Sequence, residues 1–523
     1  GGNDHSVVIC AEGYMYAWGN NKDNQLGLEA PYSSSSIVWE PRPVNTGGLT
    51  FSQVTAGSGS HNVALSCNGI VYAWGENTAY QTGQAGSVTT QPMPVPKGAT
   101  PGYSLDGTPG GNYLGDIKMI AASTSASFAL LNSGEVVAWG GNGDGGKWIQ
   151  NPTPNPFYIT KTDGTRLTNI IHISGGDNNA LFLEDADGDG LGTLYSIGNW
   201  NGRGGDGSAN AYTAAPVLDE SGNPLTTIKM SGIMDVGGFA VDGVSGYVYG
   251  WGNGGWGCSN GLPNNQTTTY ASKISSGEYQ TISGEEYLTD VLQVMGGNGY
   301  GAAITKEGYL LYWGNNTPTN GHGGSAPRPN ADSDGCKTGP IFAQYCNGKR
   351  VDDAVAISRG DMWGFMINDA NEYFVWGSNS QAGQTANYVG TLGLGDPSIK
   401  FVDCVTPLAI PCELPDQCPE AYMVGPMYKC AGQSAELFSG FTTPVGNDIN
   451  GNPLSDRYYF RWYKDGTLLN TTTKTSPVAA RRTDVYNKTQ ITVDEVGVYK
   501  VEIDYIDVNV PCNACQVVEA TIT

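Results

Sequence analysis

A sevenfold internal repeat constrains this chain more than any other feature of its sequence. Along the first 400 residues a strand-like apolar run, a glycine and a second short β run recur, and each copy closes on Trp-Gly or its equivalent. Successive closing glycines lie 54 to 65 residues apart. The seven closing pairs are Trp18-Gly19, Trp74-Gly75, Trp139-Gly140, Ile197-Gly198, Trp251-Gly252, Trp313-Gly314 and Trp376-Gly377.

Each unit offers about four short β segments, and a four-stranded sheet cannot bury both of its faces alone. The sequence therefore predicts an all-β protein in which residues 1–411 form a seven-bladed β-propeller. The 76 glycines fit this class, because glycine tolerates the positive φ angles of tight turns. The Trp of each unit is expected to fill the space between adjacent sheets, and the Gly to let two backbones approach closely.

The repeats resemble those of the regulator of chromosome condensation family. The first unit matches that family's pattern best, in Gly2-Asn-Asp-His5-Ser6, Trp18-Gly19-Asn20 and Asn24-Gln25-Leu26-Gly27. The resemblance spans about residues 1–411 and implies the seven-bladed ring. The nuclear founder of the family promotes nucleotide exchange with acidic and His side chains on one face and a protruding β-wedge. Those residues cannot be mapped onto this sequence.

The two ends of the repeat region predict how the ring closes. The chain begins inside a unit at Gly1-Gly2, and the last unit trails off through Leu392-Gly-Leu-Gly395 and Val405–Ile410. We therefore expect strands from opposite ends to complete one shared blade. The start within a unit also indicates a processed or partial chain.

The position at which the repeat favours His varies from unit to unit. It holds His5 and His61, and then, in order, Ala126, Asn179, Asp235, Tyr300 and Trp363. A catalytic site needs fixed chemistry at one place, so this variation favours a structural hydrogen-bonding role for His5 and His61 over a functional one.

After Pro411 the pattern changes. Residues 412–418 read as a Cys- and Pro-rich linker, and residues 419–523 resemble an immunoglobulin-like β-sandwich with Cys430 in an early strand, a core Trp462 and a tyrosine corner at Tyr499. Val501 stands where antibody-type domains have their second Cys, so the resemblance makes Cys512 or Cys515 the partner of Cys430. Such sandwiches usually act as spacers in large bacterial surface proteins.

The 11 cysteines favour disulfides in an oxidising compartment. Buried free thiols and zinc are the alternatives, and the zinc reading is the weaker, since Cys512-x-x-Cys515 is a single half-site. An odd count leaves at least one Cys unpaired within the chain.

An acidic loop in the fourth unit is a candidate metal site. Asp185, Asp187 and Asp189 alternate along it and Gly190 follows, an arrangement that can turn several carboxylate oxygens onto one Ca²⁺. Ser196 stands where a bidentate acid is expected. The alternative is an acidic turn whose Asp and Gly residues favour tight backbone geometry. A bound Ca²⁺ would stiffen the hairpin and would have no catalytic role.

The net charge and the absence of known enzyme motifs exclude several classes of function. The net charge of −23 argues against a nucleic-acid partner, which requires clustered Lys and Arg. The chain has no apolar run of about 20 residues and no signal-peptide pattern. It also lacks a phosphate loop, a zinc-protease motif and a nucleophile elbow, so no enzyme activity is predicted and no catalytic or cofactor-binding residue is assigned.

These observations predict an extracellular, non-enzymatic binding or adhesion module within a larger cell-surface protein, most similar to bacterial adhesins. Its partners would be a protein or a glycan on a surface, together with neighbouring domains of the same long chain, without direct membrane insertion. The alternatives are a structural subunit of a virion tail fibre or extracellular filament, an intracellular nucleotide-exchange factor, and a secreted enzyme inhibitor.

Overall fold

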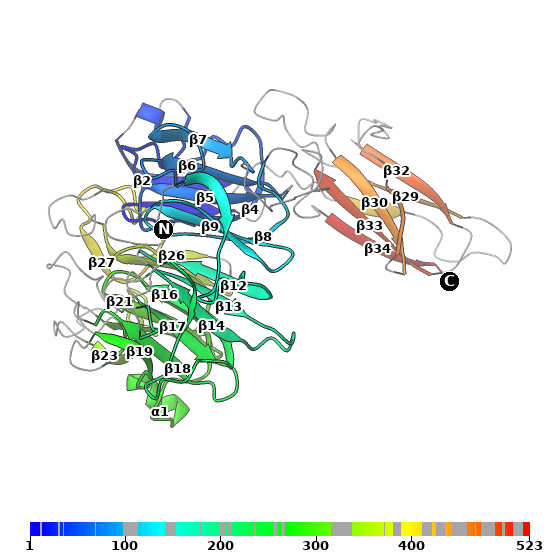
Figure 1. The fold of residues 1–523 in the computed structure, drawn as a ribbon. Coiled ribbons are helices and arrows are strands. Elements are labelled where there is room, and N and C mark those ends of the chain that lie inside the picture. The colour runs from blue at the N-terminus through cyan, green and yellow to red at the C-terminus, as the bar shows by residue number, and fades with distance from the viewer. Residues whose placement is uncertain are drawn as a thin grey trace. The chain divides into compact units, whose positions relative to one another are not determined.

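A computed structural model shows the fold (Figure 1). The residues that the structure describes are 1–10, 13–29, 32–34, 36–67, 69–97, 113–141, 153–177, 179–198, 204–207, 212–234, 237–254, 260–262, 267–314, 337–370, 372–379, 389–410, 421–424, 435–441, 458–465, 467–471, 487–493, 497–505 and 516–522. The chain divides into two compact units: the first comprises 1–9, 15–46 and 52–410, and the second 411–523 with 10–14 and 47–51.

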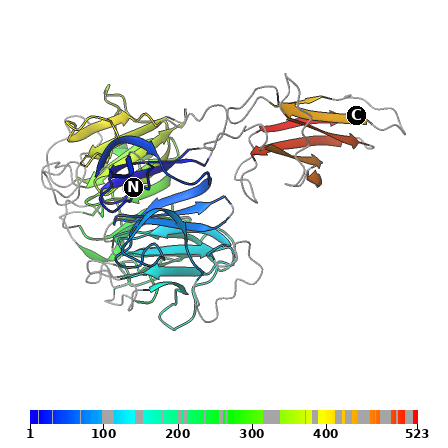
Figure 2. The same ribbon diagram turned by 90° about the horizontal axis from the view of Figure 1, so that it is seen from above.

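The first unit consists of seven antiparallel sheets that follow one another along the chain, so the predicted seven-bladed propeller is confirmed (Figures 1 and 2). The first four blades contain β1 (His5–Ile9), β2 (Met15–Asn20) and β3 (Ile37–Pro43); β4 (Phe51–Ala56), β5 (His61–Ser66), β6 (Val71–Glu76) and β7 (Val88–Pro94); β8 (Ile117–Ala122), β9 (Ala126–Leu131), β10 (Val136–Gly140) and β11 (Thr153–Tyr158); and β12 (Ile170–Gly175), β13 (Ala180–Glu184), β14 (Thr193–Ile197) and β15 (Ala215–Pro216).

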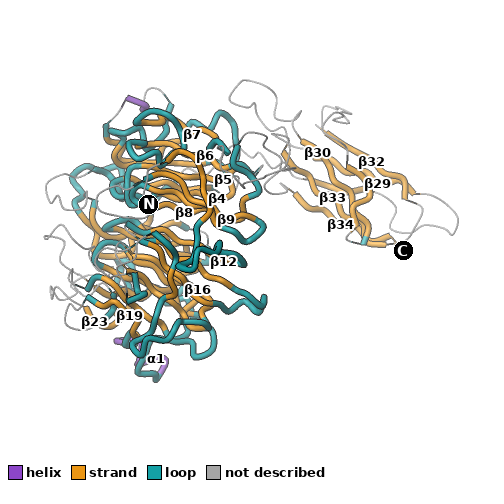
Figure 3. Tube along the Cα trace, in the orientation of Figure 1, coloured by secondary structure: helices purple, strands orange, loops and turns teal. Residues whose placement is uncertain are grey.

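The last three blades contain β16 (Ile228–Met234), β17 (Gly237–Asp242), β18 (Val248–Gly252) and β19 (Thr268–Lys273); β20 (Val291–Gly296), β21 (Tyr300–Thr305), β22 (Leu310–Gly314) and β23 (Lys337–Phe342); and β24 (Ala354–Arg359), β25 (Trp363–Asn368), β26 (Tyr373–Ser378) and β27 (Phe401–Pro407). Helical structure in the described residues is limited to η1 (Tyr32–Ser34), η3 (Gly277–Tyr279) and α1 (Gln280–Ser283), as Figure 3 shows. None of these helices has the length or apolar character needed to cross a membrane.

The Trp-Gly pairs form the packing layer between blades, as the repeat predicts. The side chains of Trp18, Trp74, Trp139, Trp251, Trp313 and Trp376 are all fully buried. The glycine that follows each of them has a positive φ of about 100°, and a Cβ at Gly75 would lie 2.3 Å from the carbonyl oxygen of Ser60. A larger residue would therefore clash with the neighbouring strand at this position.

A repeated pair of hydrogen bonds clamps neighbouring blades together. The backbone carbonyl of Gln25, in the loop after β2, accepts bonds from Trp74 Nε1 at 2.9 Å and Asn62 Nδ2 at 2.6 Å in the next blade. The carbonyl of Gln81 accepts equivalent bonds from Trp139 Nε1 at 3.0 Å and Ser127 Oγ at 2.7 Å. Each clamp satisfies a buried carbonyl and a buried indole N–H together.

An equivalent pair of hydrogen bonds joins the last blade to the first and closes the ring. The prediction that strands from the two ends of the chain share one blade is therefore corrected for the described residues. The carbonyl of Thr391 accepts hydrogen bonds from Trp18 Nε1 at 2.8 Å and Ser6 Oγ at 2.9 Å. β27 pairs with β26 inside the last blade, and the described part of the first blade contains only β1, β2 and β3. The first and last blades therefore meet through a loop and buried side chains, and no described strand crosses from one end of the chain to the other.

The second unit contains two antiparallel sheets. One has the order β28-β29-β32, from β28 (Ala421–Val424), β29 (Ala435–Phe441) and β32 (Asn487–Val493). The other has the order β31-β30-β33-β34, from β30 (Tyr458–Lys464), β31 (Thr467–Thr471), β33 (Gly497–Tyr505) and β34 (Gln516–Ile522). Trp462 pairs in register with Val501. Cys430, Cys512, Cys515 and the linker 412–418 lie outside the described residues.

Candidate functional site

Every blade has two chemically different ends. Six blades carry a Trp-Gly pair at the end of one strand, which is β2 in the first blade and the third strand in the second, third, fifth, sixth and seventh blades. The fourth blade has Ile197-Gly198 there. The turn that precedes this strand lies at the opposite end, because consecutive strands are antiparallel. The connections between blades reach that second end too. We call it the hairpin face, and it includes the turns 184–193, 242–248, 305–310 and 368–373.

The hairpin face is strongly acidic from the fourth blade to the seventh. Its turns and connections carry a set of exposed carboxylates that we call the acidic rim: Asp187, Asp189, Glu220, Glu285, Glu286, Glu307, Asp352, Asp369 and Glu372. Several basic side chains nearby are already engaged. Lys306 pairs with Asp290 at 2.8 Å, and Lys349 pairs with Asp352 at 2.9 Å. The ammonium group of Lys273 lies 4.4 Å from the ring centre of Tyr247. Much of the negative charge of the rim is therefore not neutralised by these cations.

The predicted calcium loop forms part of this rim. Oxygen atoms of Asp185, Asp187 and Asp189 lie within 4.8 Å of one another. Asp185 accepts hydrogen bonds from the backbone N–H groups of Gly188 at 2.7 Å and Gly190 at 2.9 Å. Slight desolvation raises the pKa of Asp185, but these N–H groups outweigh it and hold the pKa below its ordinary value. The three side chains converge, and backbone N–H groups of the same loop donate hydrogen bonds to two of them, Asp185 and Asp189.

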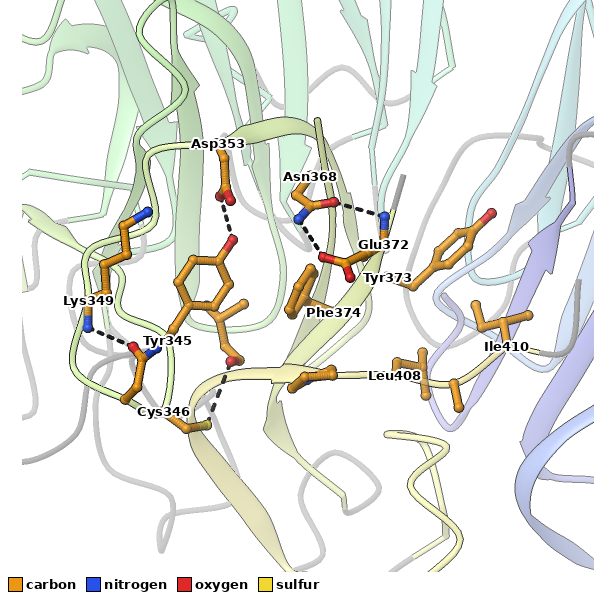
Figure 4. Close-up of a pocket in the computed structure, with 14 residues that line it drawn as sticks. Tyr345, Cys346, Lys349, Asp353, Asn368, Glu372, Tyr373, Phe374, Leu408 and Ile410 are labelled. Carbon is orange, nitrogen blue, oxygen red and sulfur yellow. Dashed lines mark hydrogen bonds between the residues drawn. The ribbon is translucent and has the colours of Figure 1, made fainter. Parts of the chain in front are cut away.

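A pocket of about 710 Å³ opens between the sixth and seventh blades (Figure 4). Tyr345, Lys349 and Asp353 enter it from the connection between these blades, while Asn368 and Glu372 come from the turn between β25 and β26. The segment 407–410 that follows β27 completes its wall. The pocket thus combines an apolar floor with carboxylate and amide groups at its edge.

Hydrogen bonds hold these polar groups in place. The hydroxyl of Tyr345 donates a short bond to the carboxylate of Asp353, and the Tyr345 ring packs on Phe374 with ring centres 5.3 Å apart. Burial, and then the bond to Asp353, raise the pKa of Tyr345 well above its ordinary value, so it stays protonated near neutrality. Asn368 Nδ2 donates to Glu372 Oε2 at 2.9 Å. These bonds hold two carboxylates, Asp353 and Glu372, in place at the edge of the pocket.

A disulfide between Cys346 and Cys404 fastens this connection to β27 beside the pocket. Cys10 and Cys67 are also disulfide-bonded. The preference for disulfides over free thiols and zinc is confirmed for these four cysteines. Cys336 lies outside the described residues.

The two histidines at the position where the repeat favours His have a structural role, as the sequence predicts. His5 and His61 are completely buried, His5 Nε2 lies 2.9 Å from Asn62 Oδ1, and His61 Nε2 lies 3.1 Å from Ser127 Oγ. Burial, and then the proximity of His5, lower the pKa of His61 to about 3. In the fifth blade the residue opposite Gly252 is Gly237, which corrects the assignment of Asp235 to this position; Asp235 itself lies outside the described residues.

The side chain of Arg359 links several blades at the Trp-Gly end of the propeller. Arg359, the last residue of β24, donates from Nη2 to Ser58 Oγ at 2.6 Å and from Nη1 to the carbonyl of Gly296 at 3.3 Å. These partners belong to the second and sixth blades. Arg359 therefore has a structural role, because its hydrogen bonds connect the seventh blade to the second and sixth blades. The acidic rim and the pocket of Figure 4 are the stronger candidates for a binding surface.

A seven-bladed ring with clamped Trp-Gly loops defines a class of repeat propeller, and the sequence comparisons give that class its name. The Regulator of chromosome condensation (RCC1) repeat matches residues 12–65 and 51–81. The chain carries RCC1 repeats on a seven-bladed β-propeller.

Curated relatives match parts of the chain. Protein pim1 of Schizosaccharomyces pombe is 28% identical over 239 residues, which is 42% of this chain and 40% of pim1. The human protein "Probable E3 ubiquitin-protein ligase HERC6" is 27% identical over 188 residues, which is 35% of this chain and 16% of that protein. The chain thus spans less than half the length of either relative.

Solved structures confirm the fold. Human WBSCR16 superposes with a TM-score of 0.56 at 19% identity, covering 76% of this chain and 94% of that one. Prp20p of Saccharomyces cerevisiae, whose structure was reported with its binding properties to Gsp1p and histones, gives a TM-score of 0.55 at 16% identity, covering 78% of this chain and 86% of that one.

These relatives correct the predicted function. The curated relatives include Protein pim1 and a protein named as a probable E3 ubiquitin-protein ligase, and neither is named as an adhesion or surface protein, so the predicted adhesion function and extracellular location are contradicted. The prediction of no enzyme activity is contradicted by the ligases among the relatives. The chain covers 16% of HERC6, so that activity belongs to the whole ligase and is not transferred to this chain. Protein partners are named for the propeller relatives, and a glycan or surface partner finds no support.

Sequence reasoning missed the acidic rim and the pocket. Residues such as Glu307 and Glu372 are far apart in sequence and lie in turns with different sequences. The signal that could have found them is the recurrence of acids at the turn between the second and third strands of successive units, once the units are aligned on Trp-Gly.

Proposed function

We propose that this propeller is a protein-binding regulator whose acidic rim receives a basic surface of its partner. The observation that carries the proposal is the concentration of exposed carboxylates on one end of a rigid ring, with Lys306 and Lys349 already paired. Complementary charge speeds encounter and selects partners more than it adds affinity. The chain's net charge of −23 acts in the same direction.

The pocket of Figure 4 supplies an anchoring point for that partner. Interfaces gain most of their energy from a few side chains that fill pockets, with a polar rim around them. A Lys or Arg side chain suits this pocket, since its aliphatic stem can lie along Phe374 and Leu408 while its charged end meets Asp353 and Glu372.

The direct test uses purified core histones as the cationic probe, because a related propeller was studied with histones. We expect the association constant to fall steeply as NaCl rises from about 50 to 300 mM, since the Debye length that screens the rim charges shortens from roughly 14 Å to roughly 6 Å. Affinity that is independent of salt would contradict the proposal.

Nucleotide exchange on a small GTPase is the second candidate. It is the activity that the resemblance to the regulator of chromosome condensation family implies, and the Prp20p structure was reported with its binding properties to Gsp1p. Its test is the release of a fluorescent guanine nucleotide from purified Gsp1p in the presence of this chain. No acceleration at saturating chain would reject exchange and leave the binding proposal standing.

Two further assignments stay proposals. We propose that Ca²⁺ stiffens the loop that carries Asp185, Asp187 and Asp189, where the three carboxylates converge. We also propose that residues 419–523 form an immunoglobulin-like spacer joined to the propeller, residues 1–411, by the linker 412–418. The two antiparallel sheets of the second unit support this assignment.

A further inference from the structure

The connection between the fifth and sixth blades departs from the repeat. Three other connections each close on one antiparallel bridge around a short turn, and these are 159–169, 217–227 and 343–353. Between β19 and β20 the equivalent bridge joins Ser275 and Tyr287, and it encloses a longer segment that contains η3 and α1. We call residues 276–286 the helical insert. In repeat proteins, insertions within single units often lie on the binding face.

Tyr279 anchors the helical insert at the hairpin face. Its side chain is 1% exposed, and its hydroxyl donates a hydrogen bond to Glu307 Oε2 at 2.8 Å. Its ring packs on Phe342 of β23, with ring centres 6.3 Å apart. Glu307 belongs to the turn 305–310, so the insert lies beside the hairpin turn of the sixth blade. Figure 1 shows α1 at the edge of the propeller.

Close backbone contacts hold the helical insert in one conformation. Gly277 has a φ of 53°, and a Cβ there would lie 2.5 Å from the carbonyl oxygen of Pro340. Ser276 Oγ donates to the carbonyl of Glu286 at 3.0 Å, which joins the two ends of the insert. Helix α1 ends at Gly284, whose φ of 74° is typical of a helix C-cap. A partner that docks on the insert therefore has little chain entropy to remove.

The outer surface of the helical insert combines an apolar side chain with carboxylates. No residue of α1 is buried, and the side chain of Ile282 is 41% exposed. Glu285 and Glu286 follow it closely in sequence and are both exposed. The insert contains no Lys or Arg. It therefore presents one aliphatic side chain beside two carboxylates that no cation of the insert neutralises.

We propose that the helical insert is the contact that selects the protein partner. Ile282 enters an apolar recess on the partner, and Glu285 and Glu286 meet Lys or Arg residues around that recess. The inference rests on the proposed function, because it assigns one part of the acidic rim to the same basic partner. Charge complementarity defines that partner, since an acidic surface would be repelled by the insert. An apolar centre with a polar surround is also where protein interfaces concentrate their binding energy.

Ile282→Ala tests the apolar contact without changing any charge. The matched control is Val244→Ala, because Val244 is 74% exposed in the regular turn 242–248 of the same face. Calorimetric titration of the full chain with core histones is carried out at about 50 and 300 mM NaCl. We expect Ile282→Ala to weaken binding roughly tenfold and Val244→Ala less than about twofold. The factor for Ile282→Ala should be the same at both salt concentrations, because salt screens charges and not apolar contacts.

Hydrogen exchange provides a second measurement on the parent chain. Histone binding should slow amide exchange at residues 280–284. Equal binding by the two variants, or unchanged exchange at 280–284 while histones still bind, would overturn the role of the insert and leave the proposed function standing. A loss in Ile282→Ala that disappears at the higher salt concentration would also overturn it. Failure of the parent chain to bind histones at either salt concentration would instead contradict the proposed function, and this inference with it.

Discussion

The indole Nε1 of Trp18 donates a 2.8 Å hydrogen bond to the carbonyl of Thr391, a residue 373 positions later in the sequence. This contact joins the first blade to the loop that precedes the last strand of the propeller. Gly393 packs against the same indole, and a Cβ there would lie 2.6 Å from Trp18 Nε1. The ring is therefore closed by the contact that also joins its internal blades.

Gly393→Ala should weaken this closure. Both Gly393, with φ 71°, and Gly164, with φ 83°, need the left-handed backbone region, but a Cβ at Gly164 would meet nothing within 4 Å. Gly164→Ala should cost about 1 kcal/mol through backbone strain alone, and Gly393→Ala about 2–3 kcal/mol because of the added clash. Urea denaturation measures both losses. Equal losses in the two variants would show that the Trp18 contact does not support the ring.

Burial of His61 makes stability depend on pH. The pKa of His61 is about 3 in the folded chain, well below 6.5, so the unfolded chain binds this proton first as the pH falls. The free energy of unfolding should decline between pH 6.5 and 3, by roughly 2–3 kcal/mol on reaching pH 4.5. His61→Gln should remove that part of the decline. A variant whose stability follows the same pH slope as the parent chain would exclude this account.

The Cys346–Cys404 disulfide should contribute to stability by restricting the unfolded chain. It closes a loop with a sequence separation of 58, for which the chain-entropy estimate is about 4 kcal/mol. Peptide mapping without reductant should recover the linked pair, and the double change Cys346→Ser with Cys404→Ser should lower the Tm. Free thiols at both positions in the native protein would contradict the assignment.

Calcium should bind at the loop that carries Asp187 and Asp189. Isothermal titration with CaCl₂ should show binding that the double change Asp187→Asn with Asp189→Asn abolishes. The matched control is Asp219→Asn, because Asp219 also accepts backbone N–H bonds within its own turn, from Ser221 and Asn223. No heat of binding in the parent chain, or equal loss in the control, would identify the loop as an acidic turn only.

The propeller was predictable from sequence because its determinants are local and repeated. Each Trp-Gly pair predicts a buried side chain and a glycine-dependent backbone position within two residues, and six such pairs together with Ile197-Gly198 mark the seven units. The closure was not predictable, since the carbonyl of Thr391 carries no side-chain signature and Thr stands where other units have Gln25 and Gln81.

Function was predicted poorly for a related reason. The acidic rim is assembled from turns that differ in sequence, such as those carrying Glu307 and Asp369, and only the ring brings them to one end. The calcium loop was visible because its three carboxylates are close in sequence. Inference from the cysteines led to an extracellular setting, and the relatives overturned it.

The most direct test of the proposed function neutralises the rim. Glu285→Gln, Glu286→Gln, Glu307→Gln and Glu372→Gln are combined in one variant, and the control variant removes the same number of charges from the Trp-Gly end. Those control changes are Asp23→Asn, Glu29→Gln, Asp206→Asn and Asp396→Asn. Calorimetric titration with core histones at 100 mM NaCl should show at least tenfold weaker binding for the rim variant and less than threefold for the control. Equal weakening would contradict the assignment of this face as the partner site.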